Sequence, residues 1–489
     1  MTDAAEPQAT RPDPATTSGS EPDDAEFMRR LEALVLKLLR KRVRSPRGFW
    51  KLQLDLLALE REVQKAITWA KADQAPDSYR KLRDFRGTLW QARRFGDAIA
   101  WLMFKGDRRQ IYPLSENSKV PVPPDDHGSR GVIGVAHAMY PKYGFPILHD
   151  ITDILRVGDV SFIKPDELPL TVEIKTTVVD EKSDGKVRTI NLNATAIWPQ
   201  PEASGHPRDD RRPPKPRQAA MSSPRFHRQL ERLSAAQLLR GADAGGTAVV
   251  SGRKTMIVEP PGSRPTSHWP LISRLVRRAR RYGYACGVAD KAVFYIVMYD
   301  RSGVGARVAD SVSSDLLASG ILFLKPEDTQ RNSLWVVAMP EPGRNGPLRY
   351  QPYFLYPLPQ SWIVDLLHSR LVIVACLNIG RVAASLEQAG FATEDQGGGQ
   401  FPLVFHEWKH EGGRLRASMP SIGEHMTEMI MEGMSLDYVV DLAKAVAKAM
   451  EEHVPSLIAE EKARRAKVAD VGAVRLTALR THHGDQTND

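Results

Sequence analysis

The sequence contains only two cysteines, Cys286 and Cys376, among its 489 residues. Two cysteines cannot form a disulfide framework or a four-cysteine zinc site, which fits a reducing compartment. Long apolar runs are also missing, because stretches such as Leu371 to Leu377 are well short of the roughly 20 residues that cross a bilayer. The first 26 residues are acidic, unlike a secretory signal. We therefore expect a cytoplasmic protein that is neither secreted nor membrane-spanning.

Aromatic residues make up only 7% of the chain and do not alternate regularly with basic residues, so stacking on single-stranded nucleic acid is not specifically indicated. Hydrophobic residues, at 42%, and charged residues, at 26%, are close to the average of soluble globular proteins. This composition excludes a wholly disordered, collagenous or coiled-coil protein. The formal net charge of +9 and the pI near 9.4 favour polyanionic partners.

Composition and periodicity divide the sequence into five regions. They are a disordered acidic tail over 1–26, a helical hairpin over 27–75, a mixed region over 76–300, an α+β region of unassigned role over 301–421, and C-terminal helices with a tail over 422–489. Within the third region, residues 199–224 are rich in proline and arginine and almost lack apolar side chains, which predicts a mobile insertion. The predicted fold class is α/β, in the mixed α+β sense.

Hydrophobic periodicity predicts the individual elements. Apolar residues at spacings of three and four after Phe27, and again from Leu52, predict the two helices of the hairpin. Further helices are predicted over 79–104, 226–239, 271–282 and within 422–466, where Ser435 is a candidate N-cap. Strands are predicted over 157–163, 170–179, 187–198, 292–299, 321–324, 334–339, 350–356 and 371–377.

The strongest local signal is Gly158-Asp159, followed in the next predicted strand by the run from Val172 to Lys175. Alternate side chains share one face of a strand, so Glu173 and Lys175 point to the same side while their apolar neighbours point to the core. A hairpin between the two strands would bring Asp159 beside Glu173. Two carboxylates and an amine would then converge at one point.

This arrangement suits phosphodiester hydrolysis, which needs a hard divalent cation with oxygen ligands, an activated water and a neutralised leaving oxygen. Asp159, Glu173 and the backbone carbonyl of Ile174 would hold Mg²⁺, with Mn²⁺ as a substitute. Lys175 would orient the attacking water, or lower its pKa, and offset charge on the pentacovalent phosphate. The alternative is that Glu173 and Lys175 are an ordinary solvent-facing pair on an amphipathic strand, since isolated E-x-K triplets are common.

The two segments resemble the motifs of the PD-(D/E)xK superfamily of restriction-endonuclease-like nucleases. The resemblance lies in Leu155 to Val160 and Val172 to Thr177, and it covers less than half of the chain, from Tyr79 to about Tyr299. It implies a restriction-endonuclease-like core sheet flanked by helices, so region 76–300 is interpreted as the nuclease-like domain. By position, the resemblance also implies two metal-binding residues and one catalytic residue, namely Asp159, Glu173 and Lys175.

Other residues of the site follow from the same resemblance. Gly158 stands where the motif usually has proline, which is a frequent variation. A helix before the motif often supplies another acid, and Asp97 is the best-placed candidate, although it is equally well explained as an N-cap after Gly96. A helix after the lysine commonly presents basic or amide residues, here Arg228 and Gln229, whose alternative role is an exposed basic face.

The predicted helix over 271–282 carries five arginines within eight residues and no acid among them. Their spacing spreads them around most of a helix, so about three could face one partner. A nucleic-acid backbone is the leading partner, and the candidates to bind it are Arg277, Arg278 and Arg281.

One segment competes with this interpretation, because His406-Glu407-Trp408-Lys409-His410 matches the H-E-x-x-H pattern of zinc proteases. That pattern needs both histidines one turn apart on a helix. The apolar run before it and Gly412-Gly413 after it predict instead a strand that enters a hairpin turn, with Arg414 to Ser418 returning. On a strand the two histidines stand about 13 Å apart, too far for one zinc. The metalloprotease stays an alternative.

Together these patterns predict a Mg²⁺-dependent nuclease, with double-stranded DNA favoured over RNA. The resemblance implies a setting in bacterial defence or DNA processing. A catalytically silent nucleic-acid-binding or assembly subunit that has kept the fold is the alternative. The terminal regions could serve a homo-oligomer or a partner in a defence complex. Endonucleolytic and exonucleolytic cutting are equally compatible with the sequence.

Overall fold

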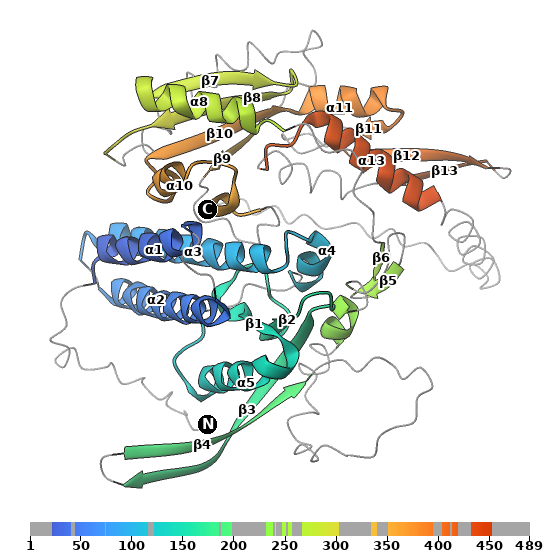
Figure 1. Cartoon of the computed structure of the whole chain (residues 1–489). Coiled ribbons are helices and arrows are strands. Elements are labelled where there is room, and N and C mark those ends of the chain that lie inside the picture. The colour runs from blue at the N-terminus through green and yellow to red at the C-terminus, as the bar shows by residue number, and fades with distance from the viewer. Residues whose placement is uncertain are drawn as a thin grey trace, which may run out of the picture.

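The structure is a computed structural model that describes residues 22–40, 45–73, 75–115, 122–184, 187–197, 231–237, 240, 247–250, 253–256, 267–302, 334–339, 351–394, 403–410, 413–418 and 432–451. Two four-stranded antiparallel sheets lie toward opposite ends of the molecule, and a layer of long helices lies between them (Figure 1). The architecture is mixed helix and sheet, so the predicted α+β class is confirmed at this level.

Three helices form the central layer: α1 (Asp24–Leu39), α2 (Pro46–Ala72) and α3 (Ser78–Met103). The first two begin at capping residues, because the side chains of Asp23 and Ser45 each accept a hydrogen bond from a backbone N–H in the first turn. α2 packs against both other helices, through apolar residues repeated at helical spacing. The predicted helical hairpin and the third helix are confirmed.

The first sheet has the strand order β1-β2-β3-β4. Its strands are β1 (Phe145–Leu148), β2 (Val160–Ile163), β3 (Leu170–Asp184) and β4 (Val187–Ile197). Val160 lies opposite Val172, so the predicted hairpin of β2 and β3 is confirmed. Helix α5 (His127–Tyr143) contacts all four strands. Neither α5 nor β1 is predicted from the sequence.

The second sheet has the order β7-β8-β10-β9. It consists of β7 (Tyr284–Ala289), β8 (Val293–Tyr299), β10 (Leu371–Asn378) and β9 (Leu334–Met339), with helix α8 (Trp269–Tyr282) packed on β7 and β8. The basic helix and the strands near 292–299, 334–339 and 371–377 are therefore confirmed. Because β8 pairs directly with β10, the domain boundary expected at residue 300 falls within this sheet.

The structure contains further labelled helices and strands. They are α4 (Arg108–Ile111), η2 (Tyr112–Leu114), η3 (His149–Ile151), β5 (Thr247–Val250), β6 (Arg253–Met256), η5 (Tyr353–Leu355), α10 (Gln360–Leu367), α11 (Ile379–Gln388), β11 (Ala392–Glu394), β12 (Leu403–His410), β13 (Gly413–Ser418) and α13 (Leu436–Glu451), where η is a 3₁₀ helix. None of the helices in the described ranges is both long enough and apolar enough to span a bilayer.

Three local predictions are wrong. The strand predicted over 350–356 is replaced by η5, because Pro352 precedes a turn whose Phe354 ring packs edge-on against Phe95 of α3, 5.4 Å away between centroids. Ser435 precedes α13 as predicted, but it does not supply the cap. The N–H of Leu436 donates instead to Asp290 Oδ2, at 2.9 Å. Residues 1–21 of the predicted acidic tail, the insertion over 199–224 and the strand over 321–324 lie outside the described residues. The end of the predicted tail is wrong, because residues 24–26 form the first turn of α1.

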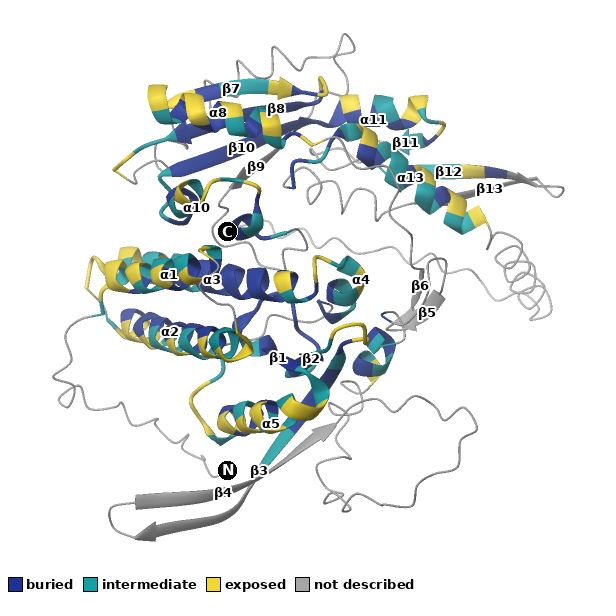
Figure 2. Cartoon of the chain, in the orientation of Figure 1, coloured by how far each residue is buried: buried dark blue, intermediate teal, exposed yellow. Residues whose placement is uncertain are grey.

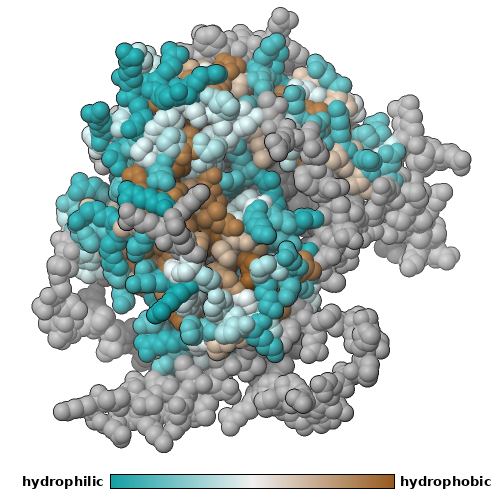
Figure 3. Space-filling model, viewed as in Figure 1, coloured by the Kyte–Doolittle hydropathy of each residue, from teal (hydrophilic) through white to brown (hydrophobic). Residues whose placement is uncertain are grey.

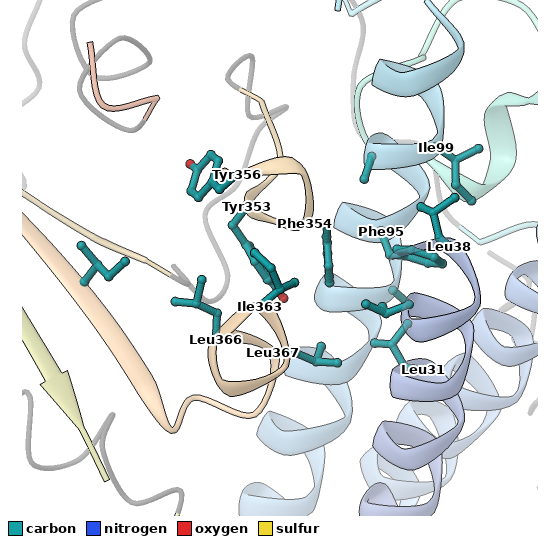
Figure 4. Close-up of a cluster of buried hydrophobic side chains, with 14 of the residues drawn as sticks. Leu31, Leu38, Phe95, Ile99, Tyr353, Phe354, Tyr356, Ile363, Leu366 and Leu367 are labelled. Carbon is teal, nitrogen blue, oxygen red and sulfur yellow. The ribbon is translucent and has the colours of Figure 1, made fainter. Parts of the chain in front are cut away.

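The central helices are joined to the C-terminal half by a continuous apolar core. Figure 4 shows residues of α1 and α3, such as Leu31 and Phe95, facing residues of η5 and α10, such as Phe354 and Leu367. All four side chains are buried, and much of α3 is accordingly dark blue in Figure 2. Polar contacts reinforce the join, since the Tyr353 hydroxyl donates to Gln91 Oε1. The two halves therefore share one core.

Candidate active site

The turn before β2 places Asp159 directly against β3. The N–H of Asp159 donates to the carbonyl of Val172 at 2.9 Å. Its carboxylate atom Oδ2 accepts from the N–H of Ile174 at 2.6 Å. Asp159 therefore lies beside the pair Glu173 and Ile174, as the predicted hairpin requires.

Alternation along β3 separates charge from core as expected. Val172 and Ile174 are buried in the apolar core. Lys175 Nζ donates to Glu173 Oε1 at 2.5 Å, which is the bond expected of two side chains on one face. The Glu173 side chain is 4% exposed and the Lys175 side chain 40%, so solvent reaches the group from the lysine side.

The backbone carbonyl of Ile174 faces the same edge as Asp159. In an extended strand the N–H and C=O of one residue leave the backbone on the same side. Since the Ile174 N–H points to Asp159, its carbonyl oxygen also points toward β2. The structure thus brings together the oxygens of Asp159, Glu173 and Ile174 and the amine of Lys175.

Burial and the repulsion between the two carboxylates disfavour the charged form of Asp159. Burial, followed by the charge of Glu173, raises the pKa of Asp159 to about 8, against the bond from Ile174 N and the charge of Lys175. A cation would relieve that repulsion, and oxygen donors suit Mg²⁺. The residues present therefore fit a hard divalent ion. The described residues contain no group of three or more His, Cys, Asp or Glu side chains that could hold a metal, so the ligands would be the carboxylate pair, a carbonyl and water.

This raised pKa predicts a pH-dependent stability. The ordinary pKa of an aspartate is 3.8, so between about pH 4 and pH 8 the unfolded chain releases a proton that the folded chain retains. The stabilisation is present below pH 4 and is lost as the pH rises through about 8. We expect metal-free Asp159→Asn protein to show a smaller fall in melting temperature between pH 5 and 8. Asp166→Asn, at an exposed turn position, is the matched control, and equal slopes in both variants would contradict the assignment.

The backbone conformation of Gly158, the residue before Asp159, explains why proline does not occupy this position. Its φ is +78°, which glycine adopts freely, whereas proline is fixed near −65°. A Cβ at this position would lie 2.8 Å from Thr171 Cγ2 and 2.9 Å from the carbonyl oxygen of Val172. The left-handed turn therefore lets Asp159 approach β3 closely.

A chain of buried hydrogen bonds stabilises this turn. His149 Nδ1 donates to the carbonyl of Gly158 at 3.1 Å, so its Nε2 accepts from Ser161 Oγ at 2.8 Å. Burial lowers the pKa of His149 to about 3, which keeps the ring neutral. Ser161 and Thr171 hydroxyls lie 2.7 Å apart, and Arg240 donates to Thr171 at 2.7 Å. The sequence analysis missed these residues, although Ser161 and Thr171 are polar positions on a buried strand face.

Asp97 holds a neighbouring loop. It is fully buried in the middle of α3, so the N-cap interpretation is wrong. Its Oδ1 accepts from the N–H groups of Asp153 and Ile154, at 2.8 and 2.9 Å, and its Oδ2 accepts from Arg94 at 3.1 Å. With these bonds Asp97 positions the loop after η3, and the structure does not place its carboxylate with the pair of Asp159 and Glu173.

Asp150, in η3, is an acid of the site that the sequence analysis missed. Burial raises its pKa to about 6, and the charge of Glu173 adds to the shift while Arg93 opposes it. Arg93 of α3 donates to the carbonyls of Asp150, at 3.2 Å, and Thr152, at 3.3 Å. An acid two residues after an apolar run was the available signal, but the four-residue strand β1 was too short to be predicted.

The remaining predicted contacts lie either outside the described residues or away from this site. Arg228 and Gln229 lie outside the described residues, although residues 231–237 that follow them are helical. Arg277, Arg278 and Arg281 are exposed on α8, with the helical layer between them and β3 (Figure 1).

The H-E-x-x-H segment forms the strand β12, paired with β13, so the predicted strand is confirmed. The ring of His406 lies 4.6 Å from that of Trp408 and 5.3 Å from that of Phe391, between centroids. Because this segment is a strand, its two histidines are not one helical turn apart, as a zinc-protease motif requires.

Comparisons with protein-family models, curated proteins and solved structures found no match for the chain.

Proposed function

We propose that the chain is a metal-dependent nuclease that hydrolyses phosphodiester bonds in nucleic acid, with Asp159, Glu173 and Lys175 at its active site. The observation that supports this most directly is the 2.6 Å hydrogen bond between Ile174 N and Asp159 Oδ2. It joins two segments that are 15 residues apart in sequence and collects two carboxylates, a carbonyl and an amine at one edge of the sheet.

Each residue has a distinct role in this proposal. Asp159, Glu173 and the carbonyl of Ile174 would hold Mg²⁺ or Mn²⁺. A bound ion would supply Lewis-acid stabilisation of the phosphate and a water of lowered pKa. Lys175, whose amine is partly exposed, orients the attacking water and offsets negative charge as the bond to the leaving oxygen breaks. Arg93 and Asp97 position the loop that carries Asp150.

The arginines of α8, together with Arg228 and Gln229 of the helix predicted over 226–239, are proposed to bind the nucleic-acid backbone. Double-stranded DNA is the favoured substrate, and a cytoplasmic role in bacterial defence or DNA processing is part of the same proposal. The second candidate is a silent binding subunit. It is favoured by the ion pair that engages Lys175 with Glu173 and by the raised pKa of Asp159.

Cleavage of labelled DNA and RNA with and without Mg²⁺ tests the proposal. We expect strand breaks with Mg²⁺ or Mn²⁺ and none with a chelator, because without the metal no water of lowered pKa is available as the nucleophile. Lys175→Ala protein purified in parallel controls for a contaminating nuclease. Binding without cleavage would favour the silent subunit, and neither binding nor cleavage would reject both candidates.

A further inference from the structure

Strand β7 is an edge of the second sheet, and its outer side has no partner strand among the described residues (Figure 1). In an antiparallel pair, residues bonded to the neighbouring strand alternate with residues whose N–H and C=O point away from it. The bond from Tyr299 N to the carbonyl of Gly283, at 2.7 Å, fixes this alternation in β7 and β8. The N–H and C=O groups of Tyr284, Cys286 and Val288 therefore point to the outer side of β7.

This edge lacks the features that commonly prevent the addition of a strand. β7 reads Tyr-Ala-Cys-Gly-Val-Ala, so it contains neither a charged residue nor a proline. Three of the seven exposed large apolar side chains of the described chain gather here, namely Tyr282, Tyr284 and Val288. An uncharged edge with exposed apolar side chains is a template for pairing with another chain.

On the side opposite α8, the edge is apolar. Tyr284, Cys286 and Val288 alternate along β7 and therefore share this side. Cys286 packs here against buried residues of β8 and β10, which include Ile296 and Val374. The exposed fractions of Tyr284 and Val288 are 57% and 42%. A side chain of an added strand that points to this side would lie beside them, so an apolar residue fits best.

On the α8 side, the edge is basic. A Cβ at Gly287 would lie 3.2 Å from Leu275 Cδ2, so this side of α8 lies over β7. Arg278 is three residues after Leu275 and continues the same side of the helix. Its charge also opposes the burial-induced rise in the pKa of Cys286, which places it near the strand. Figure 3 shows hydrophilic side chains over the upper part of the molecule, where Figure 1 places α8.

The arginines on this side are spaced like alternate residues of a strand. Arg274 and Arg278 are both exposed and four residues apart, which is about 6 Å along a helix. Alternate residues of a strand are roughly 6.6 Å apart, and α8 packs along β7. Among the described residues, no carboxylate forms an ion pair with either arginine, whereas Arg280 pairs with Asp365. Successive acids on an added strand would therefore meet successive arginines.

An extended strand matches both sides at once, because its successive side chains point to opposite faces. A second copy of this chain fits less well. Antiparallel pairing of β7 with its own copy would place both α8 helices on one face of the joined sheet, with arginines of like charge facing each other. Nucleic acid has no peptide groups with which to continue the sheet.

We infer that the outer edge of β7 binds an extended segment of a partner protein in which acidic and apolar residues alternate. Main-chain hydrogen bonds to Tyr284, Cys286 and Val288 supply affinity, and the two unlike sides of the edge select the sequence. The segment would be about six residues long, because β7 has six residues. The inference goes beyond the proposed function and does not depend on it.

Fluorescence anisotropy of the full chain with a labelled peptide of alternating valine and glutamate tests the inference. The reference ligand has the same composition, with the two residue types in separate blocks, and we expect it to bind at least about 10-fold more weakly. Cys286→Pro should weaken binding of the alternating peptide by about 10-fold, because it removes an outward N–H that the bonds to β8 do not use. Cys286→Ala retains this N–H and is the matched control, which should bind as the parent does.

The two sides of the edge have separate readouts. Arg278→Glu should reverse the charge preference, so that a peptide of alternating valine and lysine binds more tightly than the glutamate peptide. Val288→Lys places a charge on the apolar side and should also weaken binding, and it replaces the proline variant if that variant does not fold. Leu168→Lys is its control, since Leu168 is an exposed apolar residue between β2 and β3. Melting temperatures verify the fold of each variant.

Equal binding of the alternating and block peptides would overturn the inference. So would unchanged binding in Cys286→Pro or Val288→Lys protein that is folded, or an unchanged charge preference in Arg278→Glu protein. Oligothymidine, measured in chelator, is the last comparison. If its binding falls in Cys286→Pro protein as peptide binding does, the edge binds nucleic acid and the inference is wrong.

Discussion

Lys175→Ala should lower cleavage by about 10²- to 10⁴-fold while leaving the fold and nucleic-acid binding nearly intact. The lysine side chain is 40% exposed, so its truncation opens no cavity in the core. Its proposed contribution is to the transition state, and the loss should therefore appear in turnover and not in affinity. Single-turnover cleavage of a labelled duplex measures the effect.

The carboxylates should behave differently from the lysine. Asp159→Ala and Glu173→Ala should lose both cleavage and Mg²⁺ or Mn²⁺ binding, because each removes a metal ligand, whereas Lys175→Ala keeps metal binding. Titration calorimetry measures the metal affinity. Lys164→Ala is a matched control, since Lys164 pairs with Glu167 in the exposed turn of the same hairpin. Near-normal turnover in the Lys175 variant, or equal metal binding in all three variants, would place the site elsewhere.

Gly96→Ala should destabilise the protein by about 3 kcal/mol or more, a loss typical of severe overpacking. A Cβ at Gly96 would overlap the carbonyl of Ile151. That carbonyl has little freedom to move, because the loop around it is tied to α3 by Arg93 and Asp97. Denaturant unfolding measures the change. Because the same loop carries Asp150, the variant should also lose cleavage at temperatures where it is still folded.

Gly87 provides the internal comparison on the same helix. A Cβ there would meet nothing within 4 Å. Gly87→Ala should therefore stabilise the protein by roughly 0.5–1 kcal/mol, the usual gain for alanine over glycine inside a helix. Changes of opposite sign from identical substitutions would establish that the contact with Ile151, and not helix propensity, governs position 96. Equal stability of the Gly96 variant and the parent would refute this.

Gly96 also illustrates how far the sequence could predict the structure. The apolar residues of α3 were sufficient to predict a helix, but Asp97 was equally well explained as an N-cap after Gly96. Glycine is needed at position 96 because the carbonyl of Ile151 lies against it. Ile151 is more than 50 residues away in sequence, so no local pattern reveals this contact. The pair of Asp159 and Glu173 was predictable because strand alternation and a short connection are both local. The loop that brings Asp150 to them was not.

Helix α5 and η5 were difficult for related reasons. α5 contains Gly128, Gly131 and Gly134, which weaken its helical signal, yet Gly131 lets the helix lie against Thr176 of β3, where a Cβ would collide. Tyr353 and Phe354 have the aromatic character of a strand. Their burial against α3 decides their conformation, and only the tertiary structure supplies that contact.

The shared core of Phe95 and Phe354 also constrains how this protein could be recombined during evolution. The two rings are 0% and 1% exposed, and Gln91 and Tyr353 beside them are buried partners of one hydrogen bond. A gene that encoded only the chain before residue 353 would leave this apolar face of α3 uncovered and prone to aggregation. We therefore do not expect the segment that contains Asp159 and Glu173 to fold stably when it is transferred to another protein without the C-terminal half.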